Sequence, residues 1–72
     1  MTREMMEELF EDYCVRYGLA WYEVFDSDLF DSVMTEIATA EGLTPEDGDL
    51  FDILFDRDPV FAEWYSGMAG DL

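Results

Sequence analysis

Large apolar side chains recur at spacings of three and four residues along almost the whole chain. This spacing gathers apolar groups on one side of a helix, whereas a strand needs alternation at every second residue. No stretch of alternating β-branched residues occurs. The 72 residues suit one acidic helical domain, 1–72, with a radius of gyration of about 11 Å. The pattern therefore predicts an all-α fold, a small single-domain bundle of three to five helices.

Residues that start and stop helices divide the chain into five segments. The expected helices cover 3–17, 19–26, 28–41, 45–57, and 59 to the glycines near the end. Side-chain oxygens are predicted to cap four of the starts: Thr2, Ser27, Thr44 and Asp58. Glycines are predicted to end three helices: Gly18, Gly42, and the pair Gly67 and Gly70. The helix over 45–57 is apolar around more than half its circumference and is expected to be central.

The chain has 19 acidic residues against three arginines, no lysine and no histidine, and its formal net charge is −16. Direct nucleic-acid binding is excluded, because three arginines among 19 acidic residues cannot neutralise a phosphate backbone. A membrane partner is not expected, since the chain lacks both a basic patch and a long apolar run. Six Phe, four Tyr and two Trp argue against disorder. One free cysteine and an acidic N-terminus favour a cytoplasmic location, in a host cell.

Groups that commonly perform catalysis are scarce. Without histidine the chain lacks the usual general base. Cys14 lies on the apolar stripe of its predicted helix and is interpreted as a small packed side chain. Nothing singles out two of the carboxylates as an acid–base pair. We therefore expect neither an enzyme nor a cofactor.

Two acidic segments, 26–31 and 46–49, invite comparison with calcium loops. Neither places the glycine and the final glutamate of an EF-hand loop in register. Acids near helix starts also stabilise the positive end of the helix dipole. The favoured interpretation is that these residues cap helices, and no metal site is expected.

Many acids fall in rows along the predicted helices. A helix separates the Cβ atoms of i, i+3 and i+4 residues by about 5–6 Å, while duplex DNA carries one phosphate charge per about 1.7 Å of axis. The rows therefore present negative charge at roughly phosphate spacing. The charge rows are Glu4, Glu7, Glu8 and Glu11; Asp26, Asp28 and Asp31; and Asp49, Asp52 and Asp56. These ten residues are the predicted partner-binding site.

With its charge rows, small size and helical pattern, the chain resembles the small acidic inhibitors of phages and mobile elements. These are the DNA-mimic anti-restriction proteins and some anti-CRISPR proteins. The resemblance implies a stoichiometric inhibitor that blocks DNA access to a host nuclease or CRISPR surveillance complex. The partner would be a basic nucleic-acid-binding protein or complex, and the chain itself a monomer or homodimer.

Two alternatives stay open. The first is another acidic interaction module, antitoxin-like or binding the transcription machinery, that uses exposed aromatic side chains. Four aromatic residues are of types enriched at interfaces, although a core role is favoured for each: Trp21, Tyr22, Trp64 and Tyr65. The second is a salt-adapted, halophilic small protein, whose acids serve solubility alone.

Overall fold

A computed structural model describes residues 1–43 and 49–71. Within these ranges it contains helices and no strand. The helices are α1 (Arg3–Tyr17), α2 (Trp21–Phe25), α3 (Leu29–Ala40), α4 (Leu50–Arg57) and α5 (Pro59–Gly70). The all-α prediction is therefore confirmed. The radius of gyration, 11.5 Å, also agrees with the value expected from chain length.

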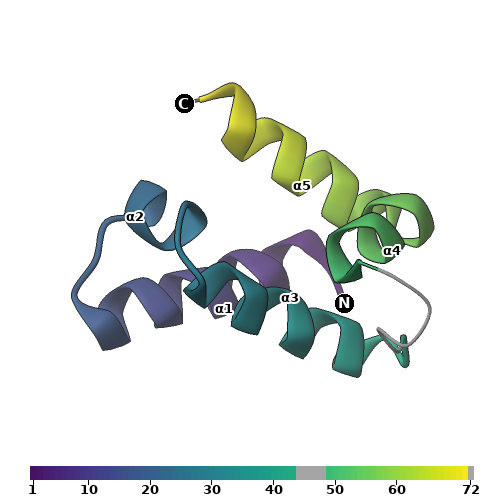
Figure 1. The fold of residues 1–72 in the computed structure, drawn as a ribbon, viewed down its shortest axis with the longest axis horizontal. Coiled ribbons are helices and arrows are strands. Elements are labelled where there is room, and N and C mark those ends of the chain that lie inside the picture. Colours follow the sequence, from purple (N-terminus) through teal and green to yellow (C-terminus); the bar gives the residue numbers. More distant parts are fainter. Residues whose placement is uncertain (44–48, 72) are drawn as a thin grey trace.

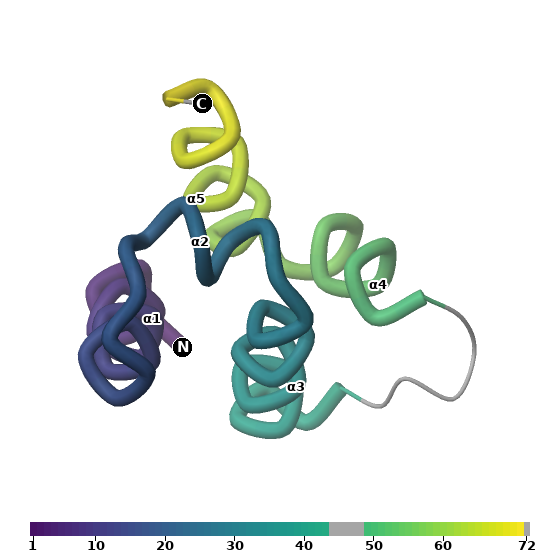
Figure 2. The backbone as a smooth tube through the Cα atoms, turned by 60° about the vertical axis from the view of Figure 1, so that its left-hand side comes forward, coloured from purple at the N-terminus to yellow at the C-terminus, as the bar shows by residue number. Residues whose placement is uncertain are grey.

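The helices pack around one buried cluster of side chains. Figures 1 and 2 show α1 and α3 side by side, with α2 between them in the chain and in contact with both. Helix α5 contacts α1, and α4 contacts both α3 and α5. Every helix contributes to the cluster, which comprises Met6, Phe10, Tyr13, Val24, Phe30, Val33, Met34, Ile37, Ala38, Leu54, Phe61 and Trp64.

Three aromatic rings from three different helices meet within this cluster. Phe10 on α1 packs edge-to-face against Phe30 on α3 and Trp64 on α5, with ring centroids 5.9 and 5.7 Å apart. The Phe30 and Trp64 centroids are 6.1 Å apart. Aromatic pairs at such distances contribute about 0.5–1.5 kcal/mol each beyond the burial of their area. This aromatic triad therefore fixes α1, α3 and α5 relative to one another.

Two of the predicted side-chain caps are formed by residues just before α1 and α5. The Thr2 hydroxyl accepts the Met5 N–H at 3.2 Å. Asp58 Oδ1 accepts two N–H groups, from Val60 at 3.0 Å and from Phe61 at 3.1 Å. Both caps satisfy backbone donors that a helix start leaves unpaired.

The other helix ends follow the same local rules. Ser27 Oγ accepts the Leu29 N–H at 3.2 Å, although Asp28 is the residue that directly precedes α3. Gly18 ends α1 with φ 66°, and Gly42 follows α3 with φ 73°. This left-handed conformation is open to glycine without strain, so both predicted stops are confirmed.

The predicted helix over 45–57 is not continuous, because Asp49 is not helical. Its expected cap at Thr44 and first turn at Pro45 lie outside the described residues. Asp49, however, has an extended backbone with φ −67° and ψ 127°, and its Oδ1 accepts the Phe51 N–H at 3.0 Å. Asp49 therefore caps a helix that begins at Leu50, and residue 49 itself is not helical.

Two further expectations are also wrong. Helix α4 is not central: it has two turns, Leu54 is its one fully enclosed residue, and Phe55 is 42% exposed. Helix α3 supplies more of the core. Gly67 does not end α5, which continues to Gly70 because Met68, beyond Gly67, still packs against the buried cluster.

We predict that Leu54, the one buried residue of α4, contributes most to the packing of this helix. Leu54→Ala should lower the free energy of unfolding by about 2–5 kcal/mol, because it leaves a cavity where no solvent reaches. Phe55→Ala, on the same helix, should cost about 1 kcal/mol or less because the ring is partly exposed. Urea unfolding followed by circular dichroism measures both. Equal losses for the two variants would contradict this anchoring role.

Candidate functional site

All ten residues of the charge rows are exposed to solvent. The glutamates lie on α1, one group of aspartates lies at the junction of α2 and α3, and the other lies at the start of and along α4. Figure 2 shows α1 and α4 on opposite sides of α3. The structure therefore does not bring the α1 and α4 rows onto neighbouring helices, and negative charge covers several sides of the molecule.

Several aspartates of the rows also have local roles. Asp49 caps α4 through its side chain. Asp26 and Asp28 border α2 and α3, and Asp31 lies in the first turn of α3. Acids at these helix starts interact favourably with the dipole. Asp52 lies in the first turn of α4 and is accounted for in the same way as Asp31. Asp26 at the C-cap of α2, Asp56 in the last turn of α4 and the glutamates on α1 beyond its first turn need another explanation.

Few acids are neutralised by cations. Arg16 Nη2 lies 2.6 Å from an Asp12 oxygen. Arg3 links two helices, with Nε 3.4 Å from Glu7 on α1 and Nη1 3.3 Å from Glu63 on α5. Exposed pairs of this kind stabilise by about 1 kcal/mol at most. Among the charge-row residues, Glu7 alone forms an ion pair in the part of the chain that is described.

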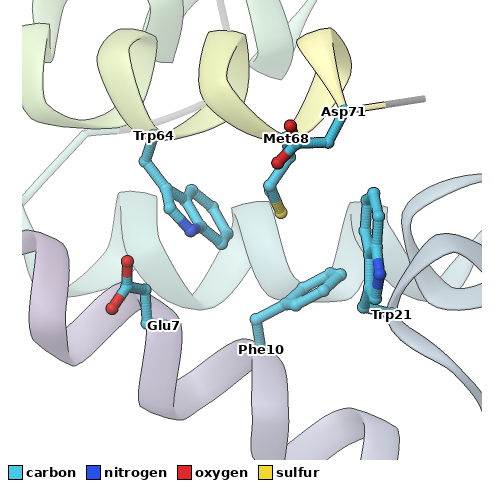
Figure 3. A pocket seen from close by; sticks show the side chains of 6 residues that line it. All are labelled: Glu7, Phe10, Trp21, Trp64, Met68 and Asp71. Atoms are coloured by element: carbon cyan, nitrogen blue, oxygen red, sulfur yellow. The ribbon is translucent and has the colours of Figure 1, made fainter.

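A pocket of about 230 Å³ opens between α1, the start of α2, and α5. Figure 3 shows Glu7 on the side of Trp64, Trp21 on the opposite side, and Phe10 and Met68 between them. The lining residues are Glu7, Phe10, Trp21, Trp64, Met68 and Asp71. Sequence reasoning noted the tryptophans singly and missed Asp71, since nothing in a linear pattern brings residues 7, 21 and 71 together.

The single cysteine is half-buried. Burial raises the pKa of the Cys14 thiol, and the negative charge of Glu11 raises it further. The thiol is therefore protonated at neutral pH and is a poor nucleophile. This agrees with the interpretation of Cys14 as a packed side chain.

Two carboxyl groups approach each other where the end of α3 meets the start of α5. Asp58 is buried, and its Oδ2 has no hydrogen-bond donor among the described residues. Burial raises the pKa of Glu41, and a hydrogen bond with Asp58 raises it further, while the Met1 amino group, 3.1 Å from Glu41 Oε1, lowers it. Two ionised carboxylates are both acceptors, so a proton on Glu41 supplies the donor that Asp58 lacks.

This pair predicts a dependence of stability on pH. Because folding raises the pKa of Glu41, its proton stabilises the fold at pH below 4.5, its ordinary pKa, and that contribution is lost as pH rises through the raised value. Glu41→Gln carries a permanent donor. At pH 7.5 it should raise the free energy of unfolding by about 0.5–1.5 kcal/mol.

Urea unfolding at pH 4.5 and 7.5 measures this effect. Relative to the unsubstituted chain, the gain from Glu41→Gln should be larger at the higher pH. Glu63→Gln, which removes an exposed charge on α5, serves as the control and should show no comparable pH-dependent gain. The carboxyl pair would be contradicted if Glu41→Gln were destabilising at pH 7.5.

No protein-family model, curated protein or solved structure matches the chain. Its candidate site is therefore judged by geometry and charge. Within residues 1–43 and 49–71, no helix is both long enough and apolar enough to cross a membrane. The same residues contain no group of three or more His, Cys, Asp or Glu side chains placed to hold a metal ion.

Proposed function

We propose that this chain is a stoichiometric inhibitor that mimics nucleic-acid charge. It occupies the nucleic-acid-binding groove of a basic protein or complex, such as a host nuclease or a CRISPR surveillance complex. One observation carries the proposal: all ten charge-row residues are exposed, yet only Glu7 forms an ion pair in the described part of the chain. A surface kept for solubility alone needs far less net charge, about 2–8 for a small domain.

The physical basis is long-range attraction. A net charge of −16 on a molecule 32 × 22 × 20 Å in extent creates a strong negative potential around it. That potential steers the chain toward a positive groove and speeds association, and added salt screens it. Acidic residues on several sides of the chain match a groove that encloses its ligand. A channel that holds a nucleic-acid duplex is a groove of this kind.

A second candidate is supported by exposed aromatic side chains near α2. Tyr17 and Tyr22 are about half exposed and Trp21 is 37% exposed. Aromatic anchors of this kind are common at protein interfaces. They favour an acidic interaction module that binds through apolar contacts, such as an antitoxin-like partner or a binder of the transcription machinery.

The first prediction from this proposal concerns competition. A tagged chain should capture a basic nucleic-acid-binding protein from a lysate of its host, and excess duplex DNA should release that protein. Affinity should fall as salt rises from 50 to 500 mM, values chosen to shorten the screening length from about 14 to 4 Å. If the captured partner binds DNA and this chain at the same time, groove mimicry is wrong and the interaction-module candidate gains support.

The second prediction assigns residues. Glu8→Gln with Glu11→Gln, and separately Asp52→Asn with Asp56→Asn, should each weaken binding by about tenfold, mainly through slower association. Glu7 and Asp49 are left intact because one forms an ion pair and the other caps α4.

A control variant removes the same amount of charge elsewhere. Glu23→Gln with Glu63→Gln changes two exposed acids outside the charge rows. Glutamine keeps an oxygen that can accept from the Ala20 N–H and from Arg3, so this variant should weaken binding less. Surface plasmon resonance with the purified partner gives both rate constants. Equal losses for all three double variants would mean that total charge matters and the rows do not.

The salt-adapted alternative makes a different prediction for the free chain. If the acids mimic nucleic-acid charge, the chain folds in low salt. The midpoint temperature of its thermal unfolding then rises modestly with salt, because salt screens the repulsion between acids. Differential scanning calorimetry at 0.05 and 2 M NaCl tests this expectation. A chain that folds only near molar salt would support halophilic adaptation in place of mimicry.

A further inference from the structure

The pocket between α1, α2 and α5 combines aromatic walls with carboxylates. Both tryptophans of the chain line it, together with the ring of Phe10. Glu7 reaches it from α1, and Asp71 reaches it from the end of α5. Aromatic faces attract cations, tryptophan most strongly, and carboxylates attract them by charge. The lining therefore suits a positively charged group carried on an apolar stem.

The size and openness of the pocket narrow the choice of occupant. At about 230 Å³ it is smaller than the 300–1,000 Å³ typical of sites for drug-sized ligands or cofactors. Trp21 is 37% exposed, so its side of the pocket lies at the surface, where another protein can reach it. Trp64 is buried, so its side of the pocket is rigid. These dimensions suit one long side chain.

An arginine of the chain itself already uses the same seam between α1 and α5. The Arg3 guanidinium lies 3.4 Å from Glu7 and 3.3 Å from Glu63, and its Nη2 is 3.7 Å from the position a Cβ on Gly67 would take. These contacts are long and exposed, so they hold Glu7 weakly. Glu7 can therefore accept a second guanidinium from outside.

We infer that this pocket receives an arginine side chain of the basic partner. This inference rests on the proposed function, which supplies a cationic protein as the ligand. The methylene stem lies against Phe10 and Met68, the guanidinium stacks on a tryptophan face, and Glu7 or Asp71 accepts its hydrogen bonds. Arginine is favoured over lysine because a planar guanidinium can stack on a ring and pair with a carboxylate together. The charge rows then attract the partner, and the pocket sets its position.

The test uses short peptides and needs no identified partner. The probe is acetyl-Gly-Gly-Arg-Gly-Gly-amide, compared with peptides carrying lysine or citrulline in place of arginine. Citrulline keeps the shape of arginine but is neutral. Nuclear magnetic resonance follows the indole N–H signals of Trp21 and Trp64, which are the only two tryptophans of the chain. The arginine peptide should shift both signals and bind about tenfold more tightly than the citrulline peptide.

Variants locate the binding. Glu7→Gln with Asp71→Asn should weaken the arginine peptide about tenfold, and Trp21→Leu should weaken it while Trp21→Phe keeps most of the affinity. Glu8→Gln with Glu11→Gln removes the same charge from the exposed face of α1, outside the pocket, and should have a smaller effect. Circular dichroism verifies that each variant is folded.

The outcomes separate this inference from the proposed function. Equal binding of arginine and citrulline peptides, or equal losses in the two double variants, would overturn the arginine pocket while leaving charge mimicry open. Selective binding of arginine in the pocket, together with a captured partner that DNA does not displace, would support the pocket and overturn mimicry. If lysine bound more tightly than arginine, the stacking geometry would be wrong.

Discussion

The contact among Phe10, Phe30 and Trp64 holds together a molecule whose surface charge favours expansion. It joins α1, α3 and α5, the three longest helices, at a point that solvent hardly reaches. A net charge of −16 adds repulsion that a small core must offset. The same rings of Phe10 and Trp64 also form part of the pocket. The contact that stabilises the fold therefore supplies the rigid part of the candidate arginine site.

Sequence patterns predicted the features of the fold that depend on neighbouring residues. Thr2, Ser27 and Asp58 accept the N–H groups of the helix starts beside them, and Gly18 has the left-handed backbone expected of a stop. The start and location of α4 were not predicted. An apolar helix was expected to be central, but burial depends on which helices cover it, and only Leu54 is enclosed.

In the candidate site, too, local features were predicted from the sequence and tertiary contacts were not. Helical spacing was enough to predict that the charge-row acids face outward, because a side chain opposite an apolar stripe points to solvent. It did not show that the rows on α1 and α4 lie on helices separated by α3. Nor did it show that Trp21, Trp64 and Asp71 share one pocket, since these residues meet through tertiary packing. The rows on α1 and α4 each follow a single helix, whereas the pocket needs residues from three parts of the fold.

The state of Cys14 has a consequence for how long the protein lasts in oxidising surroundings. Oxidation to a sulfenic acid and formation of a disulfide both start from the thiolate. Burial and the charge of Glu11 keep that form scarce. Spontaneous cross-linking of two chains through this sulfur is therefore slow, and repulsion between two strongly acidic molecules slows it further.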